Sequence, residues 1–464
     1  MSQTFPTPTP AEWRALAETA LKDRPLESLV HLDADGLAVR PLYAAATAVE
    51  PLFAPRAADA DGRAWDLRVL VEADDAGEAN AQALAALEGG AASILLAGAV
   101  VGDADALARA LDGVALELAP VALDAGFAGP AATDALAAAA RAAPRARLLF
   151  HMDPVSAFAG TGASPERMED HLAAAGQAAA RHAGTYPDAR FFLASGRVAH
   201  EAGGSIGQEL GFAAASAVAL VKAAVEAGLP VERALQGLVL GVAVDQAYFD
   251  SLAKIRALRL MWRSISRAFG AETAATVEAR SSRRMLAARD PWPNLLRLTA
   301  AGFAGAVGGA EAVVLDGFTR AQGLPDAFAR RQARNTQLVL MEEANLGRVD
   351  DPASGSWFLD HRTRELAEAG WEAFRAIEAE GGIVEALRGD LIQPQVARAR
   401  HALEHALGAG NEHLVGVTKF VDAEPRPAPA GAAGPAPAAG GGDVCAPLAP
   451  IRLAAPFEAE GAAR

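Results

Sequence analysis

The residues of this chain that could bind a metal ion most directly are His401, Glu404 and His405. Two histidines four positions apart lie on one face of a helix. A glutamate next to the second one completes the pattern by which an inverted zinc protease holds its metal and its general base. The pattern is short, however, and it arises by chance in helices rich in alanine and charged residues. We therefore expect no metal site here.

Arginines and carboxylates are the second group that could do chemistry. Arg283 and Arg284 are adjacent and could contact a phosphate, although we favour exposed arginines with carboxylate neighbours. Paired carboxylates stand at 74–75, 342–343 and 350–351. Such pairs could act as acid and base, but they are common in an acidic chain and are mostly solvated. These residues alone do not define a reaction.

Composition limits the class of protein. The 464 residues are 52% hydrophobic, which is enough for a large core. The net charge of -15 argues against nucleic acid as a partner, because phosphate binding needs a basic surface. A single cysteine, Cys445, gives no disulfide framework. The N-terminal residues lack the features of a signal peptide, and no long apolar run is free of charge. We expect a cytoplasmic protein with no membrane partner.

Short apolar runs alternate with alanine-rich stretches long enough for helices. Eight such runs favour an α/β fold of parallel βα units, and eight strands close a (β/α)8 TIM barrel. An open doubly wound sheet is the alternative. Gly160-Thr161-Gly162 does not continue into a dinucleotide-binding fingerprint. The expected strands are Asp66–Glu72, Ser93–Ala97, Val114–Leu118, Arg147–Met152, Arg190–Ser195, Leu238–Val244, Ala275–Ala279 and Ala312–Asp316. The expected helices include Glu78–Leu87, Ala132–Ala142, Gly207–Ala227 and Asp250–Phe269.

The two ends differ from this central pattern. Residues 1–50 are expected to form an N-terminal extension with an amphipathic helix, Ala11–Lys22, that carries Trp13 on its apolar side. Residues 51–423 are expected to form the barrel. Residues 424–464 begin with a stretch dominated by proline, alanine and glycine, so we expect a linker or tail that is largely disordered.

Residues 333–382 are the most informative segment. A helical register leads into Asn345-Leu346-Gly347, where the helix is expected to end. A Pro-Gly turn, the pair Trp357-Phe358 and a second long helix follow. The segment closely resembles the end of the substrate barrel in the cobalamin-dependent acyl-CoA mutases, above all methylmalonyl-CoA mutase. Three further segments resemble that family in the same order: Asp35–Tyr43, Asp250–Trp262 and Leu414–Phe420.

The resemblance implies a barrel that binds acyl-CoA along its axis, but the active-site residues of the family are missing. Trp65 and Arg68 align the first strand with that of catalytic chains, and the family's active-site tyrosine then falls on Leu70. Leucine cannot donate a hydrogen bond. The family's histidine, which contacts the thioester carbonyl, falls on Val198, with His200 two positions later. On a strand, a shift of two keeps the same face but moves the side chain about 7 Å along it, which leaves a compensating role for His200 open. We favour the simpler interpretation, a hydrogen-bonded histidine near the end of a strand.

Other polar segments of the family are eroded as well. Of its acyl-CoA contacts near residues 278–285, Arg280 and a serine remain. The segment 308–316 has lost its polar members. No histidine lies in the Asp-x-His-x-x-Gly pattern that ligates cobalamin, so no cobalamin-binding domain is expected. By resemblance, substrate contacts would persist only as vestiges at Arg68, Arg197, His200 and Arg280.

The resemblance therefore implies the small, non-catalytic chain of a heterodimeric methylmalonyl-CoA mutase. The complex would interconvert (R)-methylmalonyl-CoA and succinyl-CoA by a radical mechanism. A large catalytic chain would be the partner and would bind adenosylcobalamin and the acyl-CoA. The isolated chain would be inactive.

Two other functions stay open. One is the catalytic barrel of a split acyl-CoA mutase, which should have kept tyrosine and histidine at Leu70 and Val198. The other is a stand-alone acyl-CoA-binding barrel.

Overall fold

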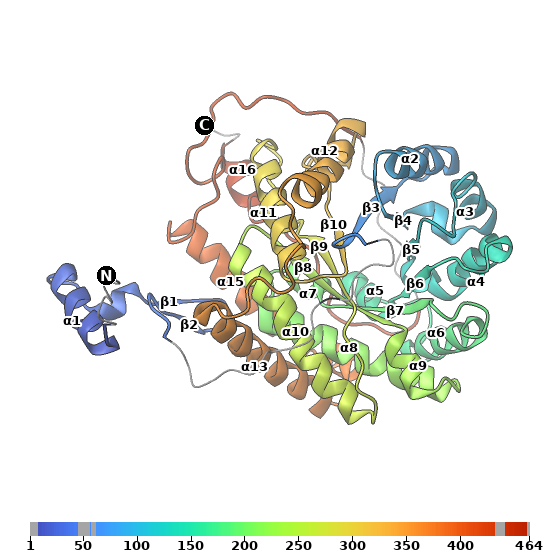
Figure 1. Cartoon of the computed structure of the whole chain (residues 1–464), viewed down its shortest axis with the longest axis horizontal. Coiled ribbons are helices and arrows are strands. Elements are labelled where there is room, and N and C mark those ends of the chain that lie inside the picture. Colours follow the sequence, from blue (N-terminus) through green and yellow to red (C-terminus); the bar gives the residue numbers. More distant parts are fainter. Residues whose placement is uncertain (1–7, 45–55, 57–61, 432–440, 462–464) are drawn as a thin grey trace, which may run out of the picture.

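A closed barrel of eight parallel strands forms the centre of the structure, a computed structural model that describes residues 8–44, 56, 62–431 and 441–461 (Figure 1). The strands follow one another around the ring in chain order, with β10 closing against β3. This confirms the α/β barrel expected from the sequence. The strands are β3 (Asp66–Glu72), β4 (Ser93–Ala97), β5 (Val121–Asp124), β6 (Leu148–Met152), β7 (Arg190–Ser195), β8 (Leu238–Val244), β9 (Val277–Ser281) and β10 (Ala312–Val314).

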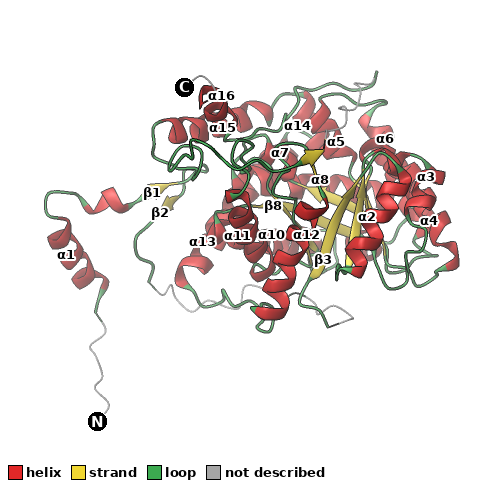
Figure 2. Cartoon of the chain, turned by 90° about the horizontal axis from the view of Figure 1, so that it is seen from above, coloured by secondary structure: helices red, strands yellow, loops and turns green. Residues whose placement is uncertain are grey.

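Helices surround the barrel (Figure 2). Those between strands are α2 (Ala76–Glu88), α3 (Ala104–Ala110), α4 (Gly129–Ala139), α5 (Pro154–Thr161), α6 (Met168–His182), α7 (Arg197–Glu201), α8 (Ile206–Glu226), α9 (Val231–Gln236), α10 (Tyr248–Ala268) and α11 (Pro293–Val307). After the barrel come α12 (Ala327–Leu338), a π-helical turn (Val339–Glu343), α13 (Trp357–Ala379), α14 (Ile383–Arg388), α15 (Gln393–Gly408) and α16 (Ala455–Gly461). Two short antiparallel pairs, β1–β2 (His31–Leu32 with Ala38–Val39) and β11–β12 (Leu324–Pro325 with Ala430–Gly431), complete the description.

Seven of the eight predicted strands overlap an observed one, and the run at Val114–Leu118 was wrong. The third strand is Val121–Asp124, whereas residues 114–118 form no strand and residues 116–118 form a turn. A strand of a closed parallel barrel is covered on both faces, so it suits Val121, Ala122 and Leu123, all fully buried. The run at 114–118 contains Glu117 and a leucine, Leu118, that is 76% exposed.

The segment that gave the resemblance forms the helix ends expected of it. The helix that begins at α12 continues through the π-helical turn and ends before Asn345, whose φ is +55°. Gly347 then takes a φ of +92°, which glycine adopts without strain. Trp357 and Phe358 begin α13; Phe358 contacts the rings of Tyr43 and Phe249.

The N-terminal extension is an arm fixed at its root. Its helix α1 (Pro10–Leu21) agrees with the predicted helix, has no buried residue, and lies away from the barrel in both views (Figures 1 and 2). At the root, Asp35 accepts hydrogen bonds from the hydroxyl of Ser205 and the backbone of Gly207, the first turn of α8. Arg362 of α13 pairs with Asp33 of the arm.

The tail is more ordered than its composition suggested. We expected residues 424–464 to be largely disordered, but residues 441–461 lie along the loops that follow the barrel strands. The backbone of Cys445 bonds to Gly162 (2.9 Å) and that of Ile451 to Glu201 (2.8 Å), and Leu448 is buried. These contacts join segments far apart in sequence, so composition alone does not indicate them. Residues 432–440 and 462–464 lie outside the described residues, and the assignment of residues 424–464 as a linker or tail stays a prediction. The boundaries at 51 and 423 stay predictions.

Among the described residues, one helix, α8, is long and apolar enough to cross a membrane, but 78% of its apolar window is buried inside the fold. That burial is typical of a core helix. Close packing against α6 is one cause: a Cβ on Gly176 would lie 2.3 Å from the backbone oxygen of Ala223.

Alanine at Gly176 should therefore destabilise the barrel. The added methyl group meets backbone of α8, so α6 must shift, and such overpacking costs about 1–3 kcal/mol. Gly408 ends α15, and a Cβ added there would have no other atom within 4 Å, which makes Gly408→Ala the matched control. Chemical denaturation should show a clear loss of unfolding free energy for Gly176→Ala and none for the control. Equal stability of the two variants would contradict the close approach.

Candidate functional site

A layer of ion-paired side chains fills the interior of the barrel. Glu278 of β9 accepts from Arg68 of β3 and, at 2.6 Å, from Arg280 of its own strand. Arg280 Nη1 also lies 2.8 Å from Asp124 Oδ2 at the end of β5, and Arg68 Nη2 lies 2.6 Å from Asp66 Oδ2. Each guanidinium thus faces two carboxylates. We call Arg68, Asp124, Glu278 and Arg280 the ionic layer.

Burial alone would favour the neutral form of these acids. Arg280 and the neighbouring cations outweigh the loss of solvation and hold the pKa of Glu278 well below its ordinary value. In the same way, burial lowers and the paired carboxylates raise the pKa of Arg68, with a net increase. The ionic layer therefore stays charged throughout the physiological pH range, and each of its charges lies beside an opposite one.

His151 lies beside the ionic layer in an unusual backbone conformation. Its φ is +47°, where a residue other than glycine is uncommon. Its Nδ1 lies 4.0 Å from Glu278 Oε2, and neither ring nitrogen has a hydrogen-bond partner within the described structure. Burial lowers the pKa of His151 to about 3. The ring is therefore neutral at physiological pH and adds no charge to the ionic layer.

Asp153 follows β6 and is the one buried carboxyl of this region with a strongly raised pKa among the described residues. Desolvation raises the pKa of Asp153 to about 7, and the neighbouring charge of Asp124 adds to the effect. The side chain accepts a hydrogen bond of 2.9 Å from the backbone of Ser156 and so caps α5. Asp153 thus combines a structural hydrogen bond with a proton equilibrium near neutral pH.

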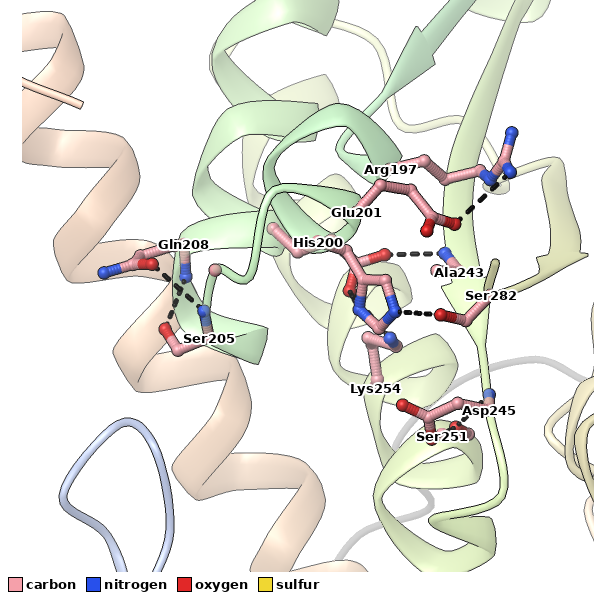
Figure 3. Close-up of polar contacts among 12 residues, drawn as sticks. Arg197, His200, Glu201, Ser205, Gln208, Ala243, Asp245, Ser251, Lys254 and Ser282 are labelled. Carbon is pink, nitrogen blue, oxygen red and sulfur yellow. Dashed lines mark hydrogen bonds and ion pairs between the residues drawn. The ribbon is translucent and has the colours of Figure 1, made fainter. Parts of the chain in front are cut away.

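A second buried network joins α7, α8, β8 and α10 (Figure 3). Glu209 of α8 accepts from Lys254 Nζ (2.7 Å) and from the backbone of Ala243 (2.6 Å). His200 Nε2 lies 2.8 Å from Ser282 Oγ, and its Nδ1 lies 3.3 Å from Glu209 Oε2. Burial lowers the pKa of His200. These side chains therefore have partners inside the fold.

The rim at the carboxyl ends of the strands is also ion-paired. Arg197 lies 3.6 Å from Glu201, whose carboxylate accepts from the backbone nitrogen atoms of residues 283 and 284. Arg283 pairs with Asp316 at 2.8 Å. These charges therefore hold the loops of the rim in place.

A large cavity opens at the opposite end of the barrel, where the strands begin. Its volume is about 1420 Å³, and its lining includes Arg63, Arg190, Arg259 and Glu311. Toward the barrel interior, the lining ends at side chains that include Arg68 and Glu278. The cavity therefore reaches as far as the ionic layer.

The structure places the two positions of the missing family residues differently from one another. Leu70 points into the barrel and packs with Leu95, Ala122, Leu149 and Val314. Val198 and His200 lie on the short helix α7, so the expectation of a strand was wrong. Residues two apart on a helix point in different directions, so His200 cannot take the place of the lost histidine. It is hydrogen-bonded, as predicted.

Of the four expected vestiges, the structure brings two together. Arg68 and Arg280 share Glu278, whereas Arg197 lies on the rim and His200 belongs to the network of Figure 3. Arg283 has the carboxylate neighbours expected for it. The motif at His401, Glu404 and His405 lies on α15, where Glu404 pairs with Arg400 at 2.7 Å; no group of three metal ligands occurs among the described residues.

Glu278, Asp124, Glu209 and Lys254 were not singled out from the sequence. A signal for Glu278 exists in β9, which reads Val-Glu-Ala-Arg-Ser, with polar residues at every second position. Alternation of this kind normally marks a strand with one solvated face. All five residues of β9 are buried, so the alternation instead shows that the interior face is charged.

The fold and this interior define a parallel eight-stranded barrel whose central charges are paired with one another. A family model described as methylmalonyl-CoA mutase matches residues 91–433. The chain is 37% identical to the methylmalonyl-CoA mutase small subunit of Streptomyces virginiae, over 91% of this chain and 73% of that protein. It is 38% identical to the probable small subunit of Mycobacterium tuberculosis (strain ATCC 25618 / H37Rv) and 33% to the small subunit of Propionibacterium freudenreichii subsp. shermanii, over 81% and 82% of this chain.

The chain therefore belongs to the methylmalonyl-CoA mutase family. It spans 64% of the length of each of the latter two relatives.

Replacing Asp153 with asparagine should flatten the dependence of stability on pH. The pKa of Asp153 is about 7 in the folded chain and about 4 when unfolded, so its contribution is complete below pH 4 and is lost as pH rises through 7. The wild-type unfolding free energy should thus fall across this window, by at most about 1.4 kcal/mol per pH unit. The amide side chain of the Asp153→Asn variant keeps the helix cap and removes this slope.

Denaturation at pH 4 to 8 measures the effect. Asp75 caps α2 through the same kind of hydrogen bond but is exposed, so Asp75→Asn is the matched control. Its slope should equal that of the wild type. An unchanged slope in Asp153→Asn would show that the buried carboxyl does not titrate as described.

Proposed function

We propose that this chain is the small, non-catalytic subunit of a heterodimeric methylmalonyl-CoA mutase. The complex interconverts (R)-methylmalonyl-CoA and succinyl-CoA in the cytoplasm, and the large subunit supplies the catalytic residues. The likeness to proteins named small subunits supports this assignment, since it extends over 81–91% of the chain.

The observation that carries the proposal is the pair Leu70 and Val198, at the positions of the family's active-site tyrosine and histidine. Leu70 is part of an apolar cluster in the barrel interior, and Val198 packs near Gly160 of α5. Neither side chain has a polar atom that could hold a thioester carbonyl or move a proton. Stabilisation of charge on that oxygen is therefore unavailable from these two positions.

The residues present do not fit adenosylcobalamin. None of the nine histidines has an aspartate two residues before it. His151 and His200, the histidines of the barrel strands and their following loops, are buried and cannot reach a cofactor outside the barrel. We therefore assign the cofactor, which supplies radical chemistry to the complex, to the large subunit.

The N-terminal extension, residues 1–50, is assigned to partner contact. Its described part exposes several apolar residues, among them Leu16 (70%) and Leu32 (63%). Trp13, Leu16, Ala17, Ala20 and Leu21 recur at helical spacing and form one face of α1. An apolar helix face of this kind is suited to a groove on another protein. The contacts of Asp33 and Asp35 with α13 and the start of α8 hold the root of the arm, while α1 remains exposed for contact with a partner.

The isolated chain should show no mutase activity, even with adenosylcobalamin supplied. The reason is the loss of both polar side chains at 70 and 198. The assay follows conversion of (R)-methylmalonyl-CoA to succinyl-CoA by the chain alone, by the large subunit alone and by the mixture. Only samples that contain the large subunit should turn over. Activity of the isolated chain would disprove the non-catalytic assignment.

Leu16→Asp should weaken association with the large subunit at least tenfold. A carboxylate carried into an apolar contact loses solvation without gaining a partner, and about 1.4 kcal/mol is enough for a tenfold change. Isothermal titration against the large subunit measures this. Leu118 is equally exposed (76%) but lies on the barrel, so Leu118→Asp serves as the control. Unchanged affinity for Leu16→Asp would remove α1 from the interface.

A further inference from the structure

One salt bridge crosses the full width of the barrel. In the ring of eight strands, β5 and β9 are separated by four positions in either direction, so they stand opposite one another. Arg280 of β9 nevertheless reaches Asp124 of β5 with a 2.8 Å contact. Side chains from opposite walls can meet only at the axis. The barrel centre is therefore occupied at this level.

Other interior side chains occupy space at the same height along the barrel axis. Arg68 of β3 meets Glu278 of β9, and the ring of His151 from β6 lies 4.0 Å from the same carboxylate. Arg68, His151 and Glu278 are each at most 3% exposed. An eight-stranded barrel is just wide enough for its side chains to fill, so buried side chains that meet from four different walls leave no room for a ligand chain.

An apolar cluster reinforces the closure. Leu70, Leu95, Leu149 and Val314 pack together with Ala122 inside the barrel. They come from β3, β4, β5, β6 and β10, and β6 and β10 again stand opposite one another. The cavity at the start of the strands is lined by Arg68, Leu149 and Glu278, members of these two groups.

We infer that this barrel is closed along its axis to acyl chains, and that the ionic layer is the closing element. The inference rests on the proposed function, because it concerns the CoA thioester that the complex would use. It adds that the inactivity does not stem from Leu70 and Val198 alone. A thioester entering from the cavity cannot pass Arg280, Asp124 and Glu278 to reach the rim.

The closure predicts which substitutions would open the barrel. Restoring tyrosine at 70 and histidine at 198 leaves the ionic layer in place, so Leu70→Tyr with Val198→His should gain no thioester binding. Glu278→Ala with Arg280→Ala removes one charge of each sign. It leaves Arg68 paired with Asp66, and leaves Asp124, whose side chain is half exposed, open to solvent. The pair therefore opens the axis without stranding a buried charge.

The experiment compares CoA with succinyl-CoA by isothermal titration on the full chain without the large subunit. The wild type and the Leu70→Tyr, Val198→His variant should bind the two compounds within twofold of one another, or bind neither. Glu278→Ala with Arg280→Ala should favour succinyl-CoA at least tenfold. Arg283→Ala with Asp316→Ala removes a charge pair from the rim and is the control; its ratio should match the wild type.

Binding of succinyl-CoA ten times tighter than CoA by the wild type or by Leu70→Tyr, Val198→His would overturn the closure. A folded Glu278→Ala, Arg280→Ala variant without the gain would overturn the role of the ionic layer. If circular dichroism shows that variant to be unfolded, the ratios of the other two chains decide. Thioester-dependent binding without turnover contradicts only the closure, whereas turnover by the isolated chain contradicts the proposed function.

Discussion

The carboxylate of Glu278, shared at the barrel axis by Arg68 and Arg280, is the interaction on which the rest of the structure depends. Branched aliphatic residues commonly fill the interior of such barrels, but here charged side chains occupy much of it. Buried ion pairs add little net stability, yet losing one partner leaves an uncompensated charge and costs several kcal/mol. The main effect of the pairing is therefore to fix the positions of the strands and not to add stability. It fixes β3, β5 and β9 relative to one another, since a shift of any one would separate the charges.

Buried ion pairs also occur where the elements outside the barrel strands attach to one another. Glu209 joins α8 to α10 and β8 through Lys254 and the backbone of Ala243. Arg362 holds the arm root, by pairing with Asp33, and the start of α10, by pairing with Asp250. Each of these groups has at least one oppositely charged partner inside the fold, so its charge is neutralised by the protein itself. Such internal pairing suits the structural role that we propose for this chain.

The sequence predicted the outer parts of the fold better than its interior. Leu238–Val244 was located to the residue, because a buried parallel strand is a short apolar run with clear ends. The ionic layer was missed for a physical reason. The alternation in Val277–Ser281 is the same for a strand that faces water and for one whose polar side chains meet others across a barrel. These two kinds of strand can be told apart only from the positions of the opposite strands, and those positions depend on closure of the barrel.

The placement of His200 shows the same limit at the candidate site. His200 lies two residues after Val198, the position of the family's histidine. On a strand these two side chains would point to the same face. The chain, however, turns into the helix α7 directly after Ser195 and Gly196. Gly196 permits this turn, since a Cβ there would lie 2.0 Å from the backbone of Glu209. The prediction therefore applied the geometry of a strand to two residues that lie on a helix. The identity of a residue can be aligned from sequence, whereas its direction depends on packing between distant segments.

These constraints leave the arm as the described segment with the least support of its own. The loops at the rim are fastened by residues 441–461, and the barrel axis is filled. By contrast, α1 is 12 residues long and has no buried residue. Isolated helices of that length are marginal in water even with good capping, and most helices in proteins depend on a packed apolar face. The capping box at Thr9 and Glu12 favours the helix but cannot replace such packing. In the proposed complex, the large subunit would supply the apolar packing that α1 lacks among the described residues.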